Sequence, residues 1–340
     1  MRHLLLATAF SCTLALHPAL AADQAMIDAA KKEGEINWYT TQIVNQYVRP
    51  AISAFEKKYG IKVNYFRGNA TDIALKVSTE AKAGKVLADV VDGTATSVML
   101  MREGHIMQWV PPNTANFDKQ FVDPNGYWVA SNFYVLTPGI NTEMIKKADA
   151  PKTYADLLDP KWKGKMVWNA TPSASAAPGF VGTILLTMGE DKGLDYLRAL
   201  AKQNVASVAS SGRQVLDQVI AGEYPLALQI FNNHASISAG QGAPTTWVPL
   251  DTSLAVIATI SVTKATSKPN AAKLFMEFVT SEEGQKLLAE AGELPVHPHV
   301  KPIDPPLRPE DGKFKAIFIS PEQLEQSMPR WAKTYQEIFR

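Results

Sequence analysis

Residues 34–65 read GEINWYTTQIVNQYVRPAISAFEKKYGIKVNY and decide the fold class. Apolar residues alternate with other residues over 36–40, which is the pattern of a half-buried strand. A helix is predicted to begin near Pro50, because proline is tolerated in the first helical turn, and to end at Gly60. Alternation returns over 61–65. A strand, a helix and a second strand in succession indicate an α/β protein.

The rest of the chain continues this alternation and divides into two α/β halves. Strands predicted over 127–136 and 254–262 would cross between the halves, near Asn132 and Asp251. Two crossings make the first lobe discontinuous. The expected division is lobe 1 over 23–131 and 252–340, and lobe 2 over 132–251, with the C-terminal helices packed on lobe 1.

The N-terminus has the layout of a secretory signal peptide. Arg2 gives a positive start, Leu4 to Leu16 is apolar, and small residues follow at Ala19-Leu20-Ala21. Residues 1–22 are therefore predicted to be cleaved, which places the mature protein in the periplasm. A buried N-terminal helix and a lipoprotein anchored through Cys12 are the alternatives.

Composition limits the function. Cleavage removes Arg2 from the 34 basic residues, which leaves 33 against 33 acidic residues. This balance argues against a nucleic-acid partner, which would favour a basic excess. Cleavage also removes Cys12, the only cysteine, so the mature chain has no disulfide and no thiolate nucleophile.

Several stretches together resemble the type II periplasmic solute-binding proteins of ABC importers, in the branch that includes ferric-ion-binding proteins. The strongest is APKTYADLLDPKWKGK over 150–165. The others, in family order, are 34–40, 54–63, 221–227 and 270–278. The resemblance implies two α/β lobes with a ligand cleft between them, hinge closure on the ligand, and docking of a monomer on a membrane permease.

Ferric-binding members carry a tyrosine pair after an Asn-Asn step in the second lobe. After Asn232-Asn233 this chain has His234 and Ala235 instead. Phenolate and carboxylate oxygens suit a hard ferric ion, and a lone imidazole does not replace them. The sequence therefore predicts that the solute is not ferric iron and that the protein holds no metal and no other cofactor. A receptor for ferric iron or another metal, and a secreted α/β hydrolase, remain the alternatives.

The predicted ligand-binding residues are mostly small hydroxyl residues at helix starts, beside strand ends. Free N–H groups and partial positive charge at helix N-termini bind carboxylate, phosphonate or phosphate. Each hydroxyl could also be an ordinary helix cap. Two arginines, three asparagines and one histidine are added as contacts with the solute. The set is Thr40, Thr41, Arg67, Asn69, Thr94, Thr96, Asn132, Ser173, Ser175, Ser210, Ser211, Arg213, Asn233 and His234.

No catalytic motif accompanies these residues. The sequence lacks a phosphate-binding loop with Lys-Ser/Thr, a Gly-x-Ser-x-Gly elbow and a His-Glu-x-x-His pair. His297-Pro298-His299 is interpreted as a surface loop and not as a metal site. Trp128 and Phe133 are further aromatic candidates for lining the cleft. The prediction is a receptor and not an enzyme.

Overall fold

The computed structural model describes residues 24–339, so the expected signal peptide over 1–22 lies outside the described part of the chain. The described strands form one sheet in the order β2-β1-β3-β9-β4-β7-β5-β6, with β8 and β10 paired to β4 and β11 to β9. Up to the second crossing, the elements are α1 (Gln24–Glu33), β1 (Ile36–Thr40), α2 (Arg49–Tyr59), β2 (Val63–Arg67), α3 (Ala70–Lys82), β3 (Val90–Gly93), α4 (Thr96–Arg102), β4 (Val129–Asn141), β5 (Met166–Asn169), α5 (Ala177–Met188), α6 (Glu190–Ala201), β6 (Ala206–Val208), α7 (Gly212–Ile220), β7 (Leu226–Phe231), α8 (Asn232–Gly240) and β8 (Thr245–Trp247). The chain continues with β9 (Ser253–Val262), α9 (Pro269–Thr280), α10 (Glu282–Glu290), β10 (Leu294–Pro295), α11 (Pro309–Gly312), β11 (Ala316–Ile319) and α12 (Pro321–Phe339).

The strand–helix–strand unit predicted over residues 34–65 is confirmed. β1 and β2 are parallel neighbours, with Ile36 opposite Val63. A π-helical turn over Val44–Val48 leads into α2, which has Pro50 in its first turn. The helix ends at Gly60, whose φ of 70° is the left-handed conformation that glycine adopts without steric cost.

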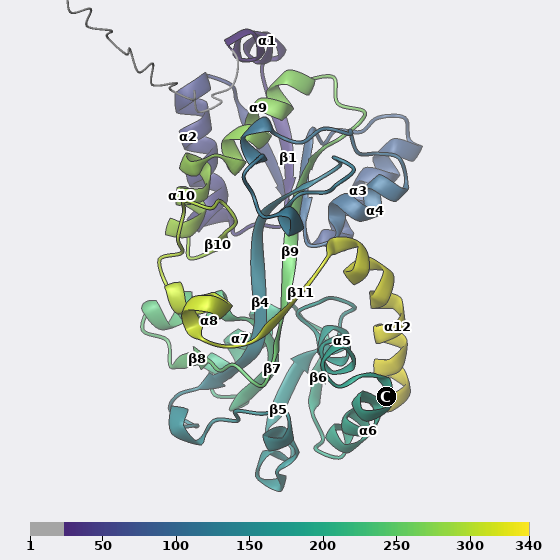
Figure 1. Ribbon diagram of the computed structural model, residues 1–340, viewed down its shortest axis with the longest axis vertical. Coiled ribbons are helices and arrows are strands. Elements are labelled where there is room, and N and C mark those ends of the chain that lie inside the picture. Colours follow the sequence, from purple (N-terminus) through teal and green to yellow (C-terminus); the bar gives the residue numbers. More distant parts are fainter. Residues whose placement is uncertain (1–23, 340) are drawn as a thin grey trace, which may run out of the picture.

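Two long antiparallel strands join the lobes (Figure 1). The first part of β4 pairs with β9 from Val129 to Leu136, and its second part pairs with β7 and β8. β9 also pairs with β3 of the first lobe. All ten residues of β9 and all thirteen of β4 are buried. Each lobe has its own apolar core on either side of these crossing strands, so the two-lobed α/β fold is confirmed.

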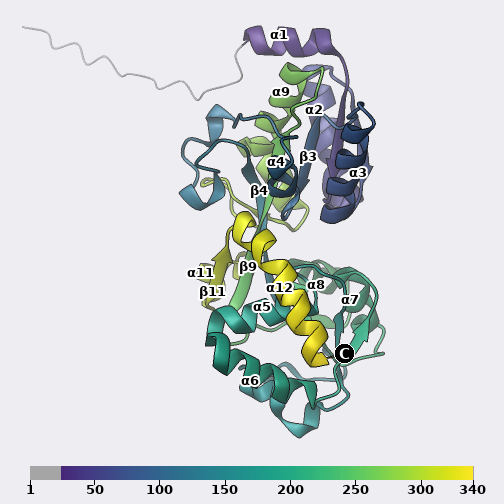
Figure 2. The same cartoon turned by 90° about the vertical axis from the view of Figure 1, so that its right-hand side faces the viewer.

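One part of the expected lobe division is wrong. α9 packs on α1 in the first lobe, as expected, but α12 packs on α5 in the second lobe. Trp331 and Tyr335 of α12 are buried in the core of the second lobe. Figure 2 shows α12, in yellow, beginning beside α4 and running down along the second lobe. Residues 321–339 therefore belong with the second lobe, because their apolar face is buried there.

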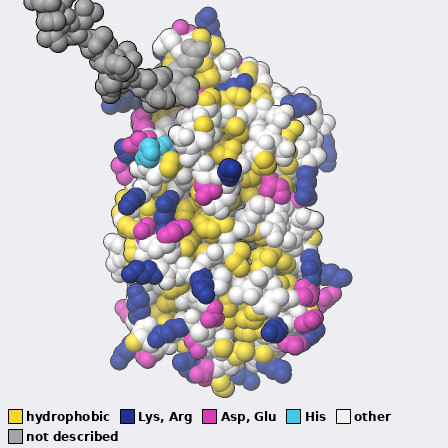
Figure 3. Space-filling view, in the orientation of Figure 1, with side chains coloured by type: hydrophobic (Ala, Val, Ile, Leu, Met, Phe, Trp, Pro, Cys, Tyr) yellow, Lys and Arg dark blue, Asp and Glu magenta, His cyan; other side chains and the backbone are white. Residues whose placement is uncertain are grey.

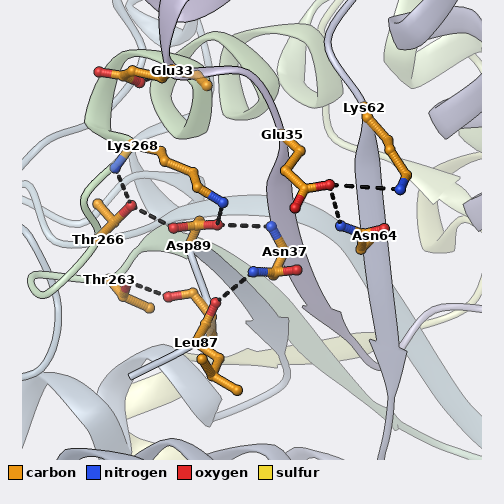
Figure 4. A network of polar contacts seen from close by, with 12 residues as sticks. Glu33, Glu35, Asn37, Lys62, Asn64, Leu87, Asp89, Thr263, Thr266 and Lys268 are labelled. Carbon is orange, nitrogen blue, oxygen red and sulfur yellow. Dashed lines mark hydrogen bonds and ion pairs between the residues drawn. The ribbon is translucent and has the colours of Figure 1, made fainter. Parts of the chain in front are cut away.

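A polar network fixes the first lobe at the end opposite the cleft (Figure 4). The carboxylate of Asp89, just before β3, accepts hydrogen bonds from the backbone N–H of Asn37 at 2.8 Å and from the hydroxyl of Thr266 at 2.6 Å. Nζ of Lys268 lies 3.9 Å from the same carboxylate. These contacts tie β1 and β3 to the loop after β9. The opposite, carboxyl ends of β1 and β3 are thereby held in register at the cleft.

Charges of both signs are interspersed over the face of the molecule seen in Figure 3. This mixture agrees with the near balance of basic and acidic residues in the sequence. Among the helices in the described part of the chain, none combines the length and apolar character needed to cross a bilayer.

Candidate ligand cleft between the lobes

The carboxyl ends of β1, β2 and β3 meet and form the first-lobe wall of the cleft. Gly93, the last residue of β3, lies between the turns that begin α3 and α4. A Cβ at Gly93 would be 2.3 Å from Oγ1 of Thr96 and 3.0 Å from Cγ2 of Thr41. The hydroxyl of Thr96 donates to the carbonyl of Ala70 at 3.3 Å, which joins the first turns of the two helices. Thr94, partly exposed, lies in the same turn.

The buried side chain of Asp92 fixes the turn after β1 in this wall. Its buried carboxylate accepts from the indole N–H of Trp38 at 2.7 Å and from the backbone N–H and hydroxyl of Thr41 at 2.8 and 2.9 Å. Burial raises the pKa of Asp92 to about 6, and the hydrogen bonds from Thr40, Thr41 and Trp38 oppose that shift. The turn after β1 is therefore held in one conformation by a side chain that the sequence analysis did not select.

Arg67 and Asn69 lie at the exposed edge of the same wall. Nη1 of Arg67 is 3.5 Å from Oδ1 of Asn69, and Asn69 caps α3 in a reciprocal pair with Asp72. Within the described residues, Arg67 makes no ion pair. Its positive charge opposes the rise in the pKa of Tyr134 that burial and Glu293 cause. An unpaired cation of the first lobe therefore acts on a side chain of the second-lobe core.

Helix starts also meet in the second-lobe wall. A Cβ at Gly212, the first residue of α7, would lie 3.2 Å from Oγ of Ser175, in the turn before α5. The buried hydroxyl of Ser210 has no hydrogen-bond partner among the described residues. Ser211 caps α7 in a reciprocal pair with Gln214, so its hydroxyl is already used. Ser173, partly exposed, lies at the edge of the turn before α5.

The guanidinium of Arg213, a predicted contact with the solute, is bound to other side chains of the protein. Nη2 of Arg213 pairs with Asp217 at 2.7 Å, and Nη1 donates to the hydroxyl of Ser238 at 2.9 Å. An aspartate one turn further along α7 compensates a cation at the start of the helix. The unfavourable helix position of this arginine thus has a local explanation and needs no anion.

His234 and Asn233 occupy the first turn of α8. The His234 ring packs edge-on against Phe231, with ring centroids 5.3 Å apart, and Phe231 lies against Tyr134. Burial, followed by the positive charge of Arg213, lowers the pKa of His234 to about 4; Asp217 opposes this shift and Arg67 contributes to it. The imidazole is therefore neutral at pH 7 and offers hydrogen bonds without charge.

A buried polar cluster at the base of the cleft was missed by the sequence analysis, apart from Asn132 and Asn233. The amide of Gln42 donates to Oδ1 of Asn132 at 2.8 Å, and the hydroxyl of Tyr134 donates to Gln42 at 3.3 Å. Nδ2 of Asn132 lies 3.4 Å from Oε2 of Glu293. No sequence motif links these residues. The one available signal was Asn132, whose position on a crossing strand makes its neighbours candidates.

Two predicted contacts, Thr40 and Thr96, and the two aromatic candidates, Trp128 and Phe133, contribute to the protein's own packing. Thr40 and Thr96 are completely buried. Oγ1 of Thr40 accepts from the backbone N–H of Gln42, so both threonines support local turns. Trp128 donates to Glu322 at 2.7 Å, and Phe133 packs between Phe121 and Phe318. These two aromatic residues belong to the first-lobe core, because their rings find apolar neighbours there.

Glu293 should make folding stability depend on pH. Burial raises its pKa from an ordinary 4.5 to about 8. Between these pH values the folded state binds more protons than the unfolded chain. The stabilisation of the folded state by this proton is therefore complete below pH 4.5 and is lost as the pH rises through 8. We expect Glu293→Gln to gain stability relative to the wild type from about pH 5 to about pH 8. Urea unfolding across this range measures the difference, and a difference that does not change with pH would contradict the assignment.

The chain matches a known protein family. Residues 88–317 match the family model described as bacterial extracellular solute-binding protein. The Fe(3+)-binding periplasmic protein of Serratia marcescens is 25% identical over 213 residues, 60% of each chain. The putative 2-aminoethylphosphonate-binding periplasmic protein of Salmonella typhimurium is 23% identical over 307 residues, 88% of this chain and 84% of the relative.

A solved structure has the same fold. The periplasmic binding protein AfuA from Actinobacillus pleuropneumoniae, with exogenous fructose-6-phosphate bound, superimposes with a TM-score of 0.77 at 24% identity. The match covers 90% of this chain and 98% of AfuA. The chain therefore belongs to the bacterial extracellular solute-binding proteins and is a periplasmic-type receptor of the ABC importer class, not an enzyme.

Proposed function

We propose that the chain binds a small solute carrying a carboxylate, phosphonate or phosphate group and delivers it, as a periplasmic monomer, to an ABC importer permease. The observation that carries the proposal is Arg67. It is exposed on the first lobe, makes no ion pair among the described residues, and acts electrostatically on Tyr134 and His234 of the second lobe. A cation between two walls attracts an anion that both walls can contact.

The two walls supply further donors for such an anion. Thr41 follows Thr40, which lies opposite Arg67 in the β1–β2 pairing, and Thr94 follows Gly93, close to Thr41. Ser175 and Ser210 lie where α5 and α7 begin. Fixed hydroxyls and helix N–H groups bind an anion without reorganising. A solute bound to the first lobe gains the serine contacts only when the lobes approach, so its differential affinity favours the closed state.

The ligands named for two relatives fit this chemistry. The 2-aminoethylphosphonate of the Salmonella relative and the fructose-6-phosphate bound to AfuA both carry a phosphorus oxyanion. Both also carry other polar groups, an amine in the first and hydroxyls in the second. The chain's own walls therefore suit either class of compound.

Ferric iron, named for the Serratia relative, fits the cleft less well. Two tyrosines lie near the cleft, Tyr47 and Tyr134, and burial raises the pKa of both hydroxyls above the ordinary value. Ionising them to phenolates would therefore be costly. Among the described residues, no three His, Cys, Asp or Glu side chains are grouped to hold a metal ion.

Calorimetric titration tests the proposal directly. The purified mature protein is titrated with 2-aminoethylphosphonate, fructose 6-phosphate, a short dicarboxylate and ferric citrate. Saturable binding of a phosphorus or carboxylate anion in metal-free buffer is the expected result. Binding of ferric citrate with a visible charge-transfer band, and no binding of the metal-free anions, would replace the proposal with an iron receptor.

A further inference from the structure

Four buried polar side chains come together where the lobes meet. Tyr47 and Glu293 come from the first lobe, Asn132 from the crossing strand β4, and Asn233 from α8 of the second lobe. Each of the four is at most 1% exposed. We call these four residues the Glu293 cluster.

Several polar atoms of the Glu293 cluster have no partner among the described residues. They are the hydroxyl of Tyr47, Oε1 of Glu293, and both Oδ1 and Nδ2 of Asn233. The amide of Asn233 is close enough to oppose the rise in the pKa of Glu293, yet no hydrogen bond of normal geometry joins the two. Each buried polar group left unpaired costs about 1–3 kcal/mol. Several such atoms around one carboxyl group indicate that a further polar group belongs among them.

The chemistry of these atoms defines that group. Asn233 Oδ1 is an acceptor, and Glu293 Oε1 accepts when the carboxyl group is ionised and can carry the proton when it is not. Asn233 Nδ2 is a donor, and the Tyr47 hydroxyl can donate or accept. No cationic side chain contributes to the pKa shift of Glu293, so a second anion would find no cation here to balance its charge. An ammonium group donates to Asn233 Oδ1 and to an ionised Glu293, whereas a hydroxyl group donates to Asn233 Oδ1 and accepts from the protonated carboxyl group.

We propose that the Glu293 cluster binds a hydrogen-bond-donating group of the solute, an ammonium or a hydroxyl, remote from the anionic group held at Arg67. This inference rests on the proposed function and narrows it to solutes with two polar ends. Inorganic phosphate or sulfate could occupy only the position at Arg67, because it has no donor group remote from its anionic oxygens. The Glu293 cluster then selects among anions that Arg67 alone does not distinguish.

Matched probes test the selection. Ethylphosphonate, 2-hydroxyethylphosphonate and 2-aminoethylphosphonate differ only in the donor, and fructose 6-phosphate is compared with methyl phosphate for a longer solute. In the wild type, at least one donor-bearing probe should bind tenfold or more tighter than its donor-free partner. In Glu293→Gln and in Asn233→Ala, this preference should fall to threefold or less. Glu277→Gln, which alters a half-buried carboxyl of α9 outside the cluster, should keep it.

Proton exchange distinguishes the two donors. An ammonium beside Glu293 would ionise it, releasing close to one proton at pH 7, whereas a hydroxyl would release none. The other titratable groups around Glu293 are Tyr47, Tyr134 and Asp92, and the two tyrosine hydroxyls stay protonated at this pH. Calorimetry in two buffers of different ionisation enthalpy measures the release, and Glu293→Gln should abolish it.

Two results would overturn the inference. Donor-bearing and donor-free probes might bind the wild type equally, with affinity that still depends on Arg67; the cluster would then hold water only. A donor preference that survives in both Glu293→Gln and Asn233→Ala would place the donor site elsewhere. Failure of every probe, and of the short dicarboxylate used to test the proposed function, to bind the wild type would instead refute the proposed function, and this inference with it. Thermal unfolding of each variant shows that it is folded.

Discussion

Replacing Arg67 with alanine is expected to weaken binding of the anionic solute by about 10- to 100-fold, since a hydrogen bond to a charged group contributes about 1.5–3 kcal/mol. The guanidinium of Arg67 makes no ion pair among the described residues, so little of its charge is compensated before the solute arrives. Folding stability should hardly change, because the side chain is exposed. Calorimetry with the anion found for the wild type measures the loss.

Arg213→Ala is the matched control. It removes an equally exposed arginine whose guanidinium already pairs with Asp217 and Ser238. Its affinity should stay within about threefold of the wild type, because a surface pair of this kind is worth less than about 1 kcal/mol. Equal losses in the two variants would show that long-range charge, and not direct contact with Arg67, holds the anion. No loss in Arg67→Ala would remove Arg67 from the site.

Replacing Gly182 with alanine is expected to destabilise the protein by about 2–3 kcal/mol, the cost of overpacking a filled core. Gly182 lies in α5 under the indole of Trp331 from α12. A Cβ at this position would lie 2.3 Å from the Trp331 ring, which has no free space to move into because it is buried in the second-lobe core. The added methyl group should push α12 off α5. Urea unfolding measures the effect.

Two companion variants separate this contact from general effects of alanine. Gly240→Ala, at the end of α8, meets no atom within 4 Å and should leave stability unchanged or slightly raised. Trp331→Ala should cost about 3–5 kcal/mol by itself. Adding Gly182→Ala to it should then cost little, because the ring that the methyl group strikes is gone. Additive losses in the double variant would contradict the packing described for α12.

Local sequence patterns predicted most of the elements. The unit over residues 34–65 was predicted with its helix start near Pro50 and its stop at Gly60, because these signals act within one turn of the chain. Helices at the C-terminal end were predicted, and α12 (Pro321–Phe339) is the last of them. Its position was predicted wrongly. An apolar stripe shows that a helix face is buried and does not identify the surface that covers it.

The ligand-binding residues stay a prediction. Helix starts at strand ends are visible in the sequence, and the structure shows only where the turns containing Thr41, Arg67 and Ser175 lie. Arg213 could not be distinguished from Arg67 by residue type, since only the structure shows which guanidinium is paired. Glu293 gave no sequence signal, because its significance comes from neighbours on three other elements.

The sequence by itself determined the α/β class, the order of strands and helices, and the family resemblance, because these follow from short-range patterns along the chain. The tertiary structure decided which lobe α12 covers, which of the two predicted arginines lacks an ion pair among the described residues, and where a buried carboxyl group meets the unpaired amide of Asn233. Those outcomes depend on contacts between residues far apart in sequence. Packing and electrostatic interactions act between residues that are close in space, so a local pattern of residue types along the sequence does not predict them.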